Sequence, residues 1–125
     1  MAKRILVVDD EQAVLETVSK RLKAKGYEVM TAGEGAKALE MVRNERPDLI
    51  ISDLMMPGMD GAELGRVLHE DRLTRNIPVI FLTALRNKDE EFERGPFVAN
   101  QRILAKPFDA KHLLQQIEEV FSEEE

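Results

Sequence analysis

Three short, largely hydrophobic runs mark the chain at intervals of about 30 to 45 residues: RILVV at 4–8, DLIIS at 48–52 and VIFL at 79–82. Because these runs do not alternate hydrophobic with polar positions, they predict strands that are buried on both faces, as in a parallel sheet. Two weaker runs, YEVMTA at 27–32 and RILA at 102–105, are further strand candidates.

The segments between these runs carry hydrophobic residues at helical spacing, which predicts four amphipathic helices. Gly26 follows the first stretch and Pro47 the second, and both are signals that end a helix. Asp60 and Glu63 form a capping pair before the third stretch, and Asp109 precedes the last. The stripes consist of Val14, Leu15, Val18 and Leu22; Ala36, Leu39 and Val42; Leu64, Val67 and Leu68; and Leu113, Leu114, Ile117, Val120 and Phe121.

The alternation of strands with helices predicts a single α/β domain over residues 1–125. Repeated strand–helix–strand units give parallel strands whose connecting helices cover both faces of the sheet. A length of 125 residues is ordinary for one domain with its own hydrophobic core. We find no linker or internal repeat in the sequence that would indicate a second domain.

Composition narrows the functional classes. The formal net charge is −6, so we expect no direct nucleic-acid binding and no attachment to an anionic membrane through this domain. The sequence has no cysteine, which excludes disulfides, zinc–thiolate sites and cysteine nucleophiles. The lack of cysteine fits a reducing cytoplasm, and no hydrophobic run approaches the roughly 20 residues of a membrane span. We therefore expect a cytoplasmic protein.

The carboxyl ends of four predicted strands carry carboxylates, a hydroxyl and an ammonium group. In chain order these residues are Asp9, Asp10, Asp53, Thr83 and Lys106. In a parallel α/β sheet, ligands bind outside the carboxyl ends of the strands, so folding would bring these side chains into one cleft. A single strand-end aspartate is more often a loop or helix cap. The coincidence of four strand ends favours a shared site.

Three carboxylates in one cleft predict a bound cation, because like charges repel one another until a cation neutralises them. With no histidine or cysteine nearby, an all-oxygen site suits a hard ion, Mg²⁺ in the first place. Magnesium usually takes one or two carboxylates and a phosphate oxygen. Lys106 could pair with a phosphoryl group there, Thr83 could donate a hydrogen bond to it, and an aspartate is a competent nucleophile towards phosphorus.

Four motifs, in their order and spacing, resemble the receiver domain of two-component response regulators. They are ILVVDDE, PDLIISDLMMPGMDG, IPVIFLTA and KPF, and they span essentially the whole chain. The resemblance implies a doubly wound (βα)5 sheet with the flavodoxin-like strand order 2-1-3-4-5. It also implies that Asp53 takes a phosphoryl group from a phosphohistidine on a sensor histidine kinase or histidine phosphotransfer protein. The signal would pass to a downstream protein target or a fused output domain.

The same resemblance assigns the metal ligands and the phosphoryl contacts. It implies that Asp10 and Asp53 bind Mg²⁺ directly, that Asp9 acts mainly through a metal-bound water, and that Met55 contributes its backbone carbonyl. The phosphoryl contacts implied for the other strand ends are a hydrogen bond from Thr83, access beside the small Ala84, and an ion pair with Lys106.

Two departures from the family pattern concern signal output. Ile103 stands where the family commonly has an aromatic residue, and Gly95-Pro96 would end a fourth helix early. Two other functional classes stay open: a receiver-fold adaptor that works without phosphorylation and, less favoured, an aspartyl-phosphate hydrolase. Such hydrolases usually place two aspartates one residue apart on the nucleophile's strand and add a cap domain, and the sequence shows neither. We therefore interpret the domain as a switch rather than an enzyme.

Overall fold

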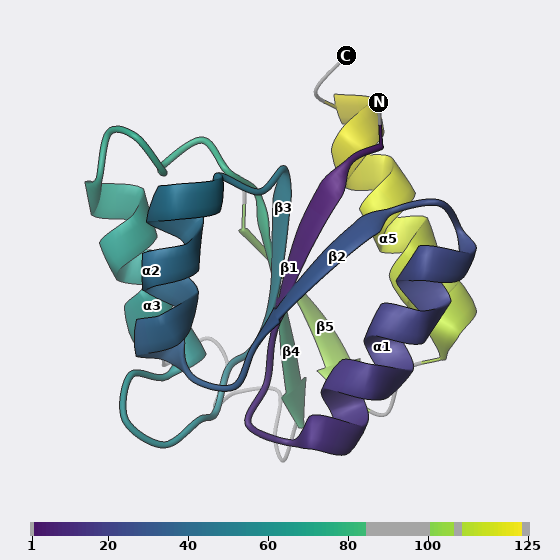
Figure 1. Ribbon diagram of the computed structural model, residues 1–125, viewed down its shortest axis with the longest axis horizontal. Coiled ribbons are helices and arrows are strands. Elements are labelled where there is room, and N and C mark those ends of the chain that lie inside the picture. Colours follow the sequence, from purple (N-terminus) through teal and green to yellow (C-terminus); the bar gives the residue numbers. More distant parts are fainter. Residues whose placement is uncertain (1, 85–100, 107–108, 124–125) are drawn as a thin grey trace.

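The computed structural model describes residues 2–84, 101–106 and 109–123, in which five strands and four helices follow one another (Figure 1). The elements are β1 (Arg4–Val8), α1 (Gln12–Ala24), β2 (Glu28–Ala32), α2 (Gly35–Glu45), β3 (Leu49–Asp53), α3 (Gly61–Glu70), β4 (Val79–Ala84), β5 (Gln101–Lys106) and α5 (Ala110–Glu123). All neighbouring strands are parallel, in the order β2-β1-β3-β4-β5. The predicted α/β fold and strand order are therefore confirmed.

The sheet separates two hydrophobic cores because neighbouring residues of its central strands point to opposite faces. Ile5 and Val7 of β1 belong to the core formed with α1 and α5, whereas Leu6 and Val8 belong to the core formed with α2 and α3. Figure 1 shows these helix pairs on opposite sides of the sheet. Burial on both faces explains why the sequence of β1 shows no alternation of hydrophobic and polar residues.

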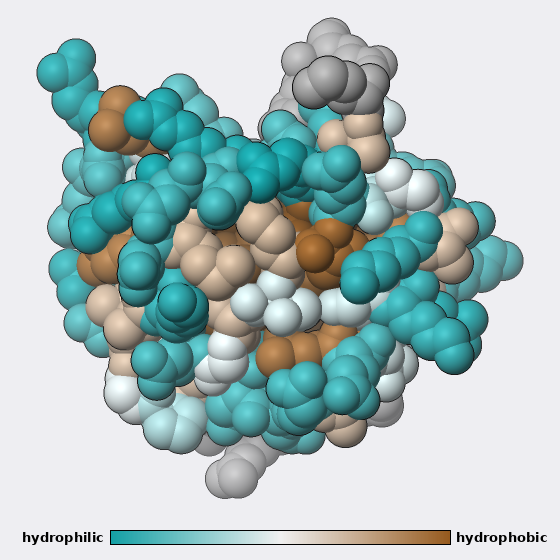
Figure 2. Space-filling model, in the orientation of Figure 1, coloured by the Kyte–Doolittle hydropathy of each residue, from teal (hydrophilic) through white to brown (hydrophobic). Residues whose placement is uncertain are grey.

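The two weak strand candidates lie at the edges of the sheet. β2 pairs only with β1, and β5 pairs only with β4, within the part of the chain that the structure describes. Val29 and Met30 of β2 are half-buried. Figure 2 shows hydrophobic side chains in the middle of the face where β2 lies, surrounded by hydrophilic ones. An edge strand is covered less completely than a central one, so its sequence carries a weaker hydrophobic signal.

Gly26 ends α1, as the sequence predicts, through a pair of backbone hydrogen bonds. Its φ angle of 92° lies in the left-handed region that favours glycine. The Gly26 N–H donates to the carbonyl of Lys23 (3.0 Å), and the Tyr27 N–H donates to the carbonyl of Leu22 (3.2 Å). This Schellman arrangement satisfies the last carbonyls of the helix and turns the chain into β2.

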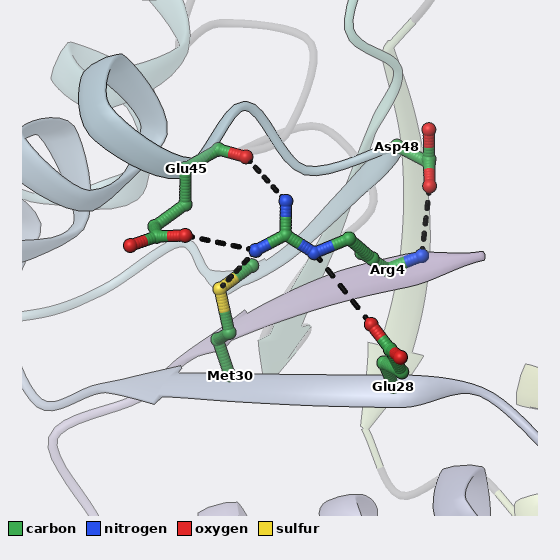
Figure 3. A network of polar contacts seen from close by, with 5 residues as sticks. All are labelled: Arg4, Glu28, Met30, Glu45 and Asp48. Carbon is green, nitrogen blue, oxygen red and sulfur yellow. Dashed lines mark hydrogen bonds and ion pairs between the residues drawn. The ribbon is translucent and has the colours of Figure 1, made fainter. Parts of the chain in front are cut away.

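Arg4 connects four segments at the amino end of the sheet (Figure 3). Its guanidinium donates to the backbone carbonyl of Glu45 (2.6 Å) and to the Glu45 carboxylate (2.9 Å), and it lies 3.7 Å from the Glu28 carboxylate. A weak contact of 3.5 Å joins it to the Met30 sulfur, and the Arg4 backbone N–H donates to Asp48 Oδ2 (2.8 Å). The start of β1 is thereby fixed to β2, to the end of α2 and to the residue before β3.

One expectation falls outside the described residues: the early end of a fourth helix at Gly95-Pro96. Among the helices that the structure describes, none combines the length and the hydrophobicity that crossing a bilayer requires. The carboxyl ends of the strands lie towards the lower edge of Figure 1.

Candidate functional site

The turn after β1 carries two carboxylates that differ in their exposure to solvent. Asp9 is only 1% exposed, and Asp10, the next residue, is exposed to solvent. The Asp9 N–H donates to the carbonyl of Ala32 (3.1 Å), which continues the pairing of β1 with β2. Asp9 Oδ1 accepts a hydrogen bond from the N–H of Glu11 (2.9 Å). Hydrogen bonds to neighbouring backbone groups thus hold both the backbone and the carboxylate of Asp9, and the exposed Asp10 stands two residues before α1.

Asp53 is the last residue of β3 and is 6% exposed. Its Oδ1 accepts a hydrogen bond from the N–H of Met55 (3.3 Å), and its carbonyl accepts one from the hydroxyl of Ser52 (3.0 Å). The N–H of Leu54 donates to the carbonyl of Leu82 (2.9 Å), so the pairing with β4 continues one residue beyond the strand. These bonds fix both the backbone and the carboxylate of Asp53.

Gly61 allows the first turn of α3 to approach the end of β3 closely. A Cβ atom at this position would lie 2.3 Å from the Asp53 carbonyl oxygen and 2.8 Å from the Leu54 Cα. Asp60 caps the helix by accepting a hydrogen bond from the Glu63 N–H (2.9 Å), which confirms the predicted cap. Sequence reasoning missed the positioning role of Gly61; the signal was a glycine directly after the cap, where alanine would favour the helix.

Three carboxylates meet at the carboxyl ends of β1 and β3. One oxygen from each of Asp9, Asp10 and Asp53 can be chosen so that all three lie within 4.8 Å of one another. Like charges at this separation repel one another, and a divalent cation among them would replace this net repulsion with net attraction. The donors are all carboxylate oxygens, which suits a hard cation such as Mg²⁺. The residues present therefore fit the metal that the sequence predicts.

The other predicted site residues lie on the two strands next to β3. Thr83 is 5% exposed on β4, one residue beyond the pair that Asp53 forms with Leu82. Ala84 and Lys106 face each other in the register of β4 and β5, at the ends of these strands. The structure describes the backbone of these last two residues and not their side chains. Their proposed contacts with a phosphoryl group stay predictions.

Ile103 lies in the middle of β5 and packs against the core on the α2 and α3 side of the sheet. It is half-buried and pairs in register with Phe81 of β4. An aliphatic side chain therefore occupies the position at which the family commonly has an aromatic one.

Comparison with known proteins identifies the family. The family model for the response regulator receiver domain matches residues 5–118. The chain is 35% identical over 127 residues to the alkaline phosphatase synthesis transcriptional regulatory protein PhoP of Bacillus subtilis, which covers 100% of this chain and 51% of PhoP. It is 43% identical over 109 residues to the response regulator PleD of Caulobacter vibrioides, covering 87% of this chain and 24% of PleD. The chain thus spans about half the length of PhoP and a quarter of PleD.

Solved structures agree with this assignment. The chemotaxis protein CheY4 of Vibrio cholerae matches with a TM-score of 0.86 and 32% identity, over 96% of this chain and 99% of CheY4. A CheY-like response regulator receiver domain protein of Methanospirillum hungatei matches with a TM-score of 0.84 and 30% identity, over 98% of this chain and 96% of that one. The strand order, the acidic cluster and these matches lead to one conclusion: this chain belongs to the response regulator receiver domain family.

Proposed function

We propose that this domain is a phosphoacceptor switch and that Asp53 receives the phosphoryl group. The observation that carries the proposal is the position of this carboxylate: Asp53 ends a central strand, is held by the Met55 N–H, and lies beside the carboxylates of Asp9 and Asp10. A nucleophile needs a fixed orientation for in-line attack, and the backbone around Asp53 supplies it.

The transfer forms one bond and breaks one bond. A carboxylate oxygen of Asp53 attacks the phosphorus atom of a phosphohistidine, and the phosphorus–nitrogen bond of the donor breaks as the new phosphorus–oxygen bond forms. The electron pair of the broken bond stays on the imidazole nitrogen of the donor. The product is an acyl phosphate on Asp53, which water later hydrolyses.

Asp9, Asp10, Asp53 and the carbonyl of Met55 are the groups that would hold Mg²⁺. When bound, the ion supplies positive charge that offsets the negative charge of the phosphoryl group and the carboxylates. Thr83 would donate a hydrogen bond to a phosphoryl oxygen, and the position of Lys106 at the end of β5 suits an ion pair with another. Ala84 would leave the phosphoryl group accessible.

The partners of such a switch are a phosphohistidine donor and a receiver of the signal. We propose a sensor histidine kinase or a histidine phosphotransfer protein as the donor. Relatives that are named as transcriptional regulatory proteins and are about twice as long support a downstream protein or a fused output domain as the recipient. The net charge of −6 argues against direct nucleic-acid binding by this domain. In this scheme the domain is a signalling switch whose chemistry acts on itself.

Incubation with acetyl phosphate and Mg²⁺, followed by intact mass measurement, tests the proposal. We expect one phosphoryl group per chain, no adduct when EDTA is present, and no adduct on Asp53→Asn. Asp48→Asn is the matched control, because Asp48 precedes the same strand at its opposite end and should leave labelling unchanged. Consumption of acetyl phosphate over many turnovers would instead support a hydrolase, and the lack of any adduct on the unmodified chain would support the phosphorylation-independent adaptor.

A further inference from the structure

The loop between β3 and α3 contains three methionines in two different environments. Met56 is 8% exposed, and Met59 is half-buried; both belong to the core on the α2 and α3 side of the sheet. Met55 is 53% exposed, although it is the second residue after Asp53. The loop is therefore anchored through Met56 and Met59, and the Met55 side chain lies at the surface, two residues after Asp53.

Exposure distinguishes Met55 from the other methionines. Met30 and Met41 are half-buried, so Met55 is the one exposed methionine in the ranges 2–84, 101–106 and 109–123. Its backbone N–H donates to the Asp53 carboxylate at 3.3 Å, which keeps the residue adjacent to the proposed phosphoacceptor. The most accessible thioether among the described residues thus belongs to the residue whose backbone N–H holds the proposed phosphoacceptor.

We propose that Met55 is an oxidation site and that its oxidation by a peroxide shortens the lifetime of the phosphorylated state. The effect on this lifetime is the second half of the inference, and it rests on the proposed function. In the oxidation, the sulfur attacks one peroxide oxygen and the oxygen–oxygen bond breaks. One oxygen joins the sulfur as a sulfoxide, and the other leaves as water with both protons when the oxidant is hydrogen peroxide. The thioether loses two electrons and the peroxide gains them.

The product changes the chemistry beside Asp53. A thioether is a weak hydrogen-bond acceptor, whereas the oxygen of a sulfoxide is a strong, polar one. Next to the acyl phosphate, that oxygen can accept a hydrogen bond from an attacking water and orient it. The fold should tolerate the change, because the side chain of Met55 is at the surface and the buried Met56 and Met59 keep the loop in place.

Peptide mapping after limited treatment with hydrogen peroxide tests the first half of the inference. Fragmentation of the peptide that contains Met55, Met56 and Met59 shows which methionine carries an added oxygen. The oxidised fraction of each methionine is followed over time. We expect Met55 to be oxidised about fivefold faster than the buried Met56, and also faster than the half-buried Met30, Met41 and Met59, in line with the exposure of each side chain. Equal rates for Met55 and Met56 would overturn the assignment, whether or not the protein can be phosphorylated.

The lifetime of the acyl phosphate tests the second half. The protein is phosphorylated with acetyl phosphate, freed of the donor, and followed by intact mass with and without prior peroxide treatment. We expect loss of the phosphoryl group to be about fivefold faster after oxidation, the effect of one added hydrogen bond on a rate. Met55→Leu should remove the response to peroxide, and Met41→Leu should keep it.

The outcomes separate the two proposals. If the untreated protein is phosphorylated but peroxide leaves its lifetime unchanged, the regulatory inference is wrong and the proposed function stands. If Met55→Leu still responds to peroxide, another residue carries the effect and the assignment is wrong. If the untreated protein takes no phosphoryl group at all, the proposed function fails, and the regulation fails with it.

Discussion

The two ends of the sheet differ in how their charged side chains are arranged: opposite charges are paired at the amino end, and like charges lie together at the carboxyl end. At the amino end, the guanidinium of Arg4 lies 2.9 Å from the carboxylate of Glu45 and 3.7 Å from that of Glu28. At the carboxyl end, the carboxylates of Asp9, Asp10 and Asp53 come within 4.8 Å of one another. Strand β1 joins the two arrangements, because Arg4 begins it and Asp9 directly follows it.

The difference indicates what each end contributes. Opposite charges at the amino end connect segments that are distant in sequence and add a little to the stability of the fold. Like charges at the carboxyl end cost free energy of folding until a cation or another positive group balances them. A fold that keeps such an arrangement does so for binding or chemistry, and strained or costly features are typical of functional sites. The stability of this end should therefore depend on its ligand.

Replacing Gly61 with alanine should have the largest effect, because it acts on the backbone that holds the acidic end together. The added Cβ would lie 2.3 Å from the Asp53 carbonyl, so α3 or the end of β3 must move. We expect Gly61→Ala to lower the free energy of unfolding by about 2–3 kcal/mol, measured by urea denaturation. Gly33→Ala is the control, since a Cβ there meets no atom within 4 Å. Equal stability of the two variants would show that α3 can shift without cost.

The contrast between Gly61 and the carboxylates shows what the sequence can and cannot reveal. The order of strands and helices follows from local hydrophobic patterns, and Asp9, Asp10 and Asp53 could be placed together because parallel strands end at the same edge of a sheet. The role of Gly61 depends on a contact between a helix and a strand end, which no local pattern encodes. The fold was therefore predictable, and the close packing around the site was not.

The contacts of Arg4 with Glu45 and Glu28 could not be predicted from the sequence for a similar reason. Glu45 meets Arg4 only because α2 ends where it does, and the next residue, Arg46, adopts a left-handed conformation with a φ angle of 46°. The ends of helices are the least certain part of any interpretation of a sequence. Charge pairs formed at such ends cannot be predicted before the fold is known.

Magnesium should stabilise the carboxyl end, and this is the second largest effect. At an ion concentration ten times the dissociation constant, binding adds about 1.4 kcal/mol to the free energy of unfolding. We expect the gain in the original protein, a strongly reduced gain in Asp10→Ala, and nearly the full gain in Met55→Ala, because Met55 would contribute only its backbone carbonyl. Thermal unfolding of each protein with Mg²⁺ and with EDTA measures the gain in stability. A larger loss in Met55→Ala than in Asp10→Ala would contradict the proposed ligands.

Removing the cation at the amino end should have a smaller effect that does not depend on magnesium. The Arg4 side chain is 36% exposed, so its ion pairs are screened by solvent. We expect Arg4→Met to cost about 1 kcal/mol, and less at high salt. Arg66→Met is the matched control, since Arg66 pairs only with its helical neighbours Glu63 and Glu70 in the described structure. If both variants lose the same stability, the connections made by Arg4 between distant segments contribute nothing beyond local pairing.

The smallest effect concerns Tyr27, which lies just before β2 at the amino end of the sheet. The centroid of its ring lies 5.8 Å from the centroid of the Phe121 ring. Burial, and then the nearby charge of Glu118, raises the pKa of Tyr27 above the ordinary value of 10.0. The folded protein therefore keeps this proton to a higher pH than the unfolded chain does. The associated stability is complete below pH 10.0 and is lost as the pH rises through the folded pKa.

Tyr27→Phe isolates this contribution because it keeps the ring and removes the ionisable hydroxyl. Urea denaturation at about pH 8 and about pH 11 should show a smaller alkaline loss in Tyr27→Phe than in the original protein. Lysines titrate in the same range, so the difference between the two proteins is the quantity to compare. Asp10→Ala should show the full alkaline loss, because it changes the opposite end of the sheet. An identical loss in Tyr27→Phe and the original protein would mean that Tyr27 ionises as easily in the folded protein as in the unfolded chain.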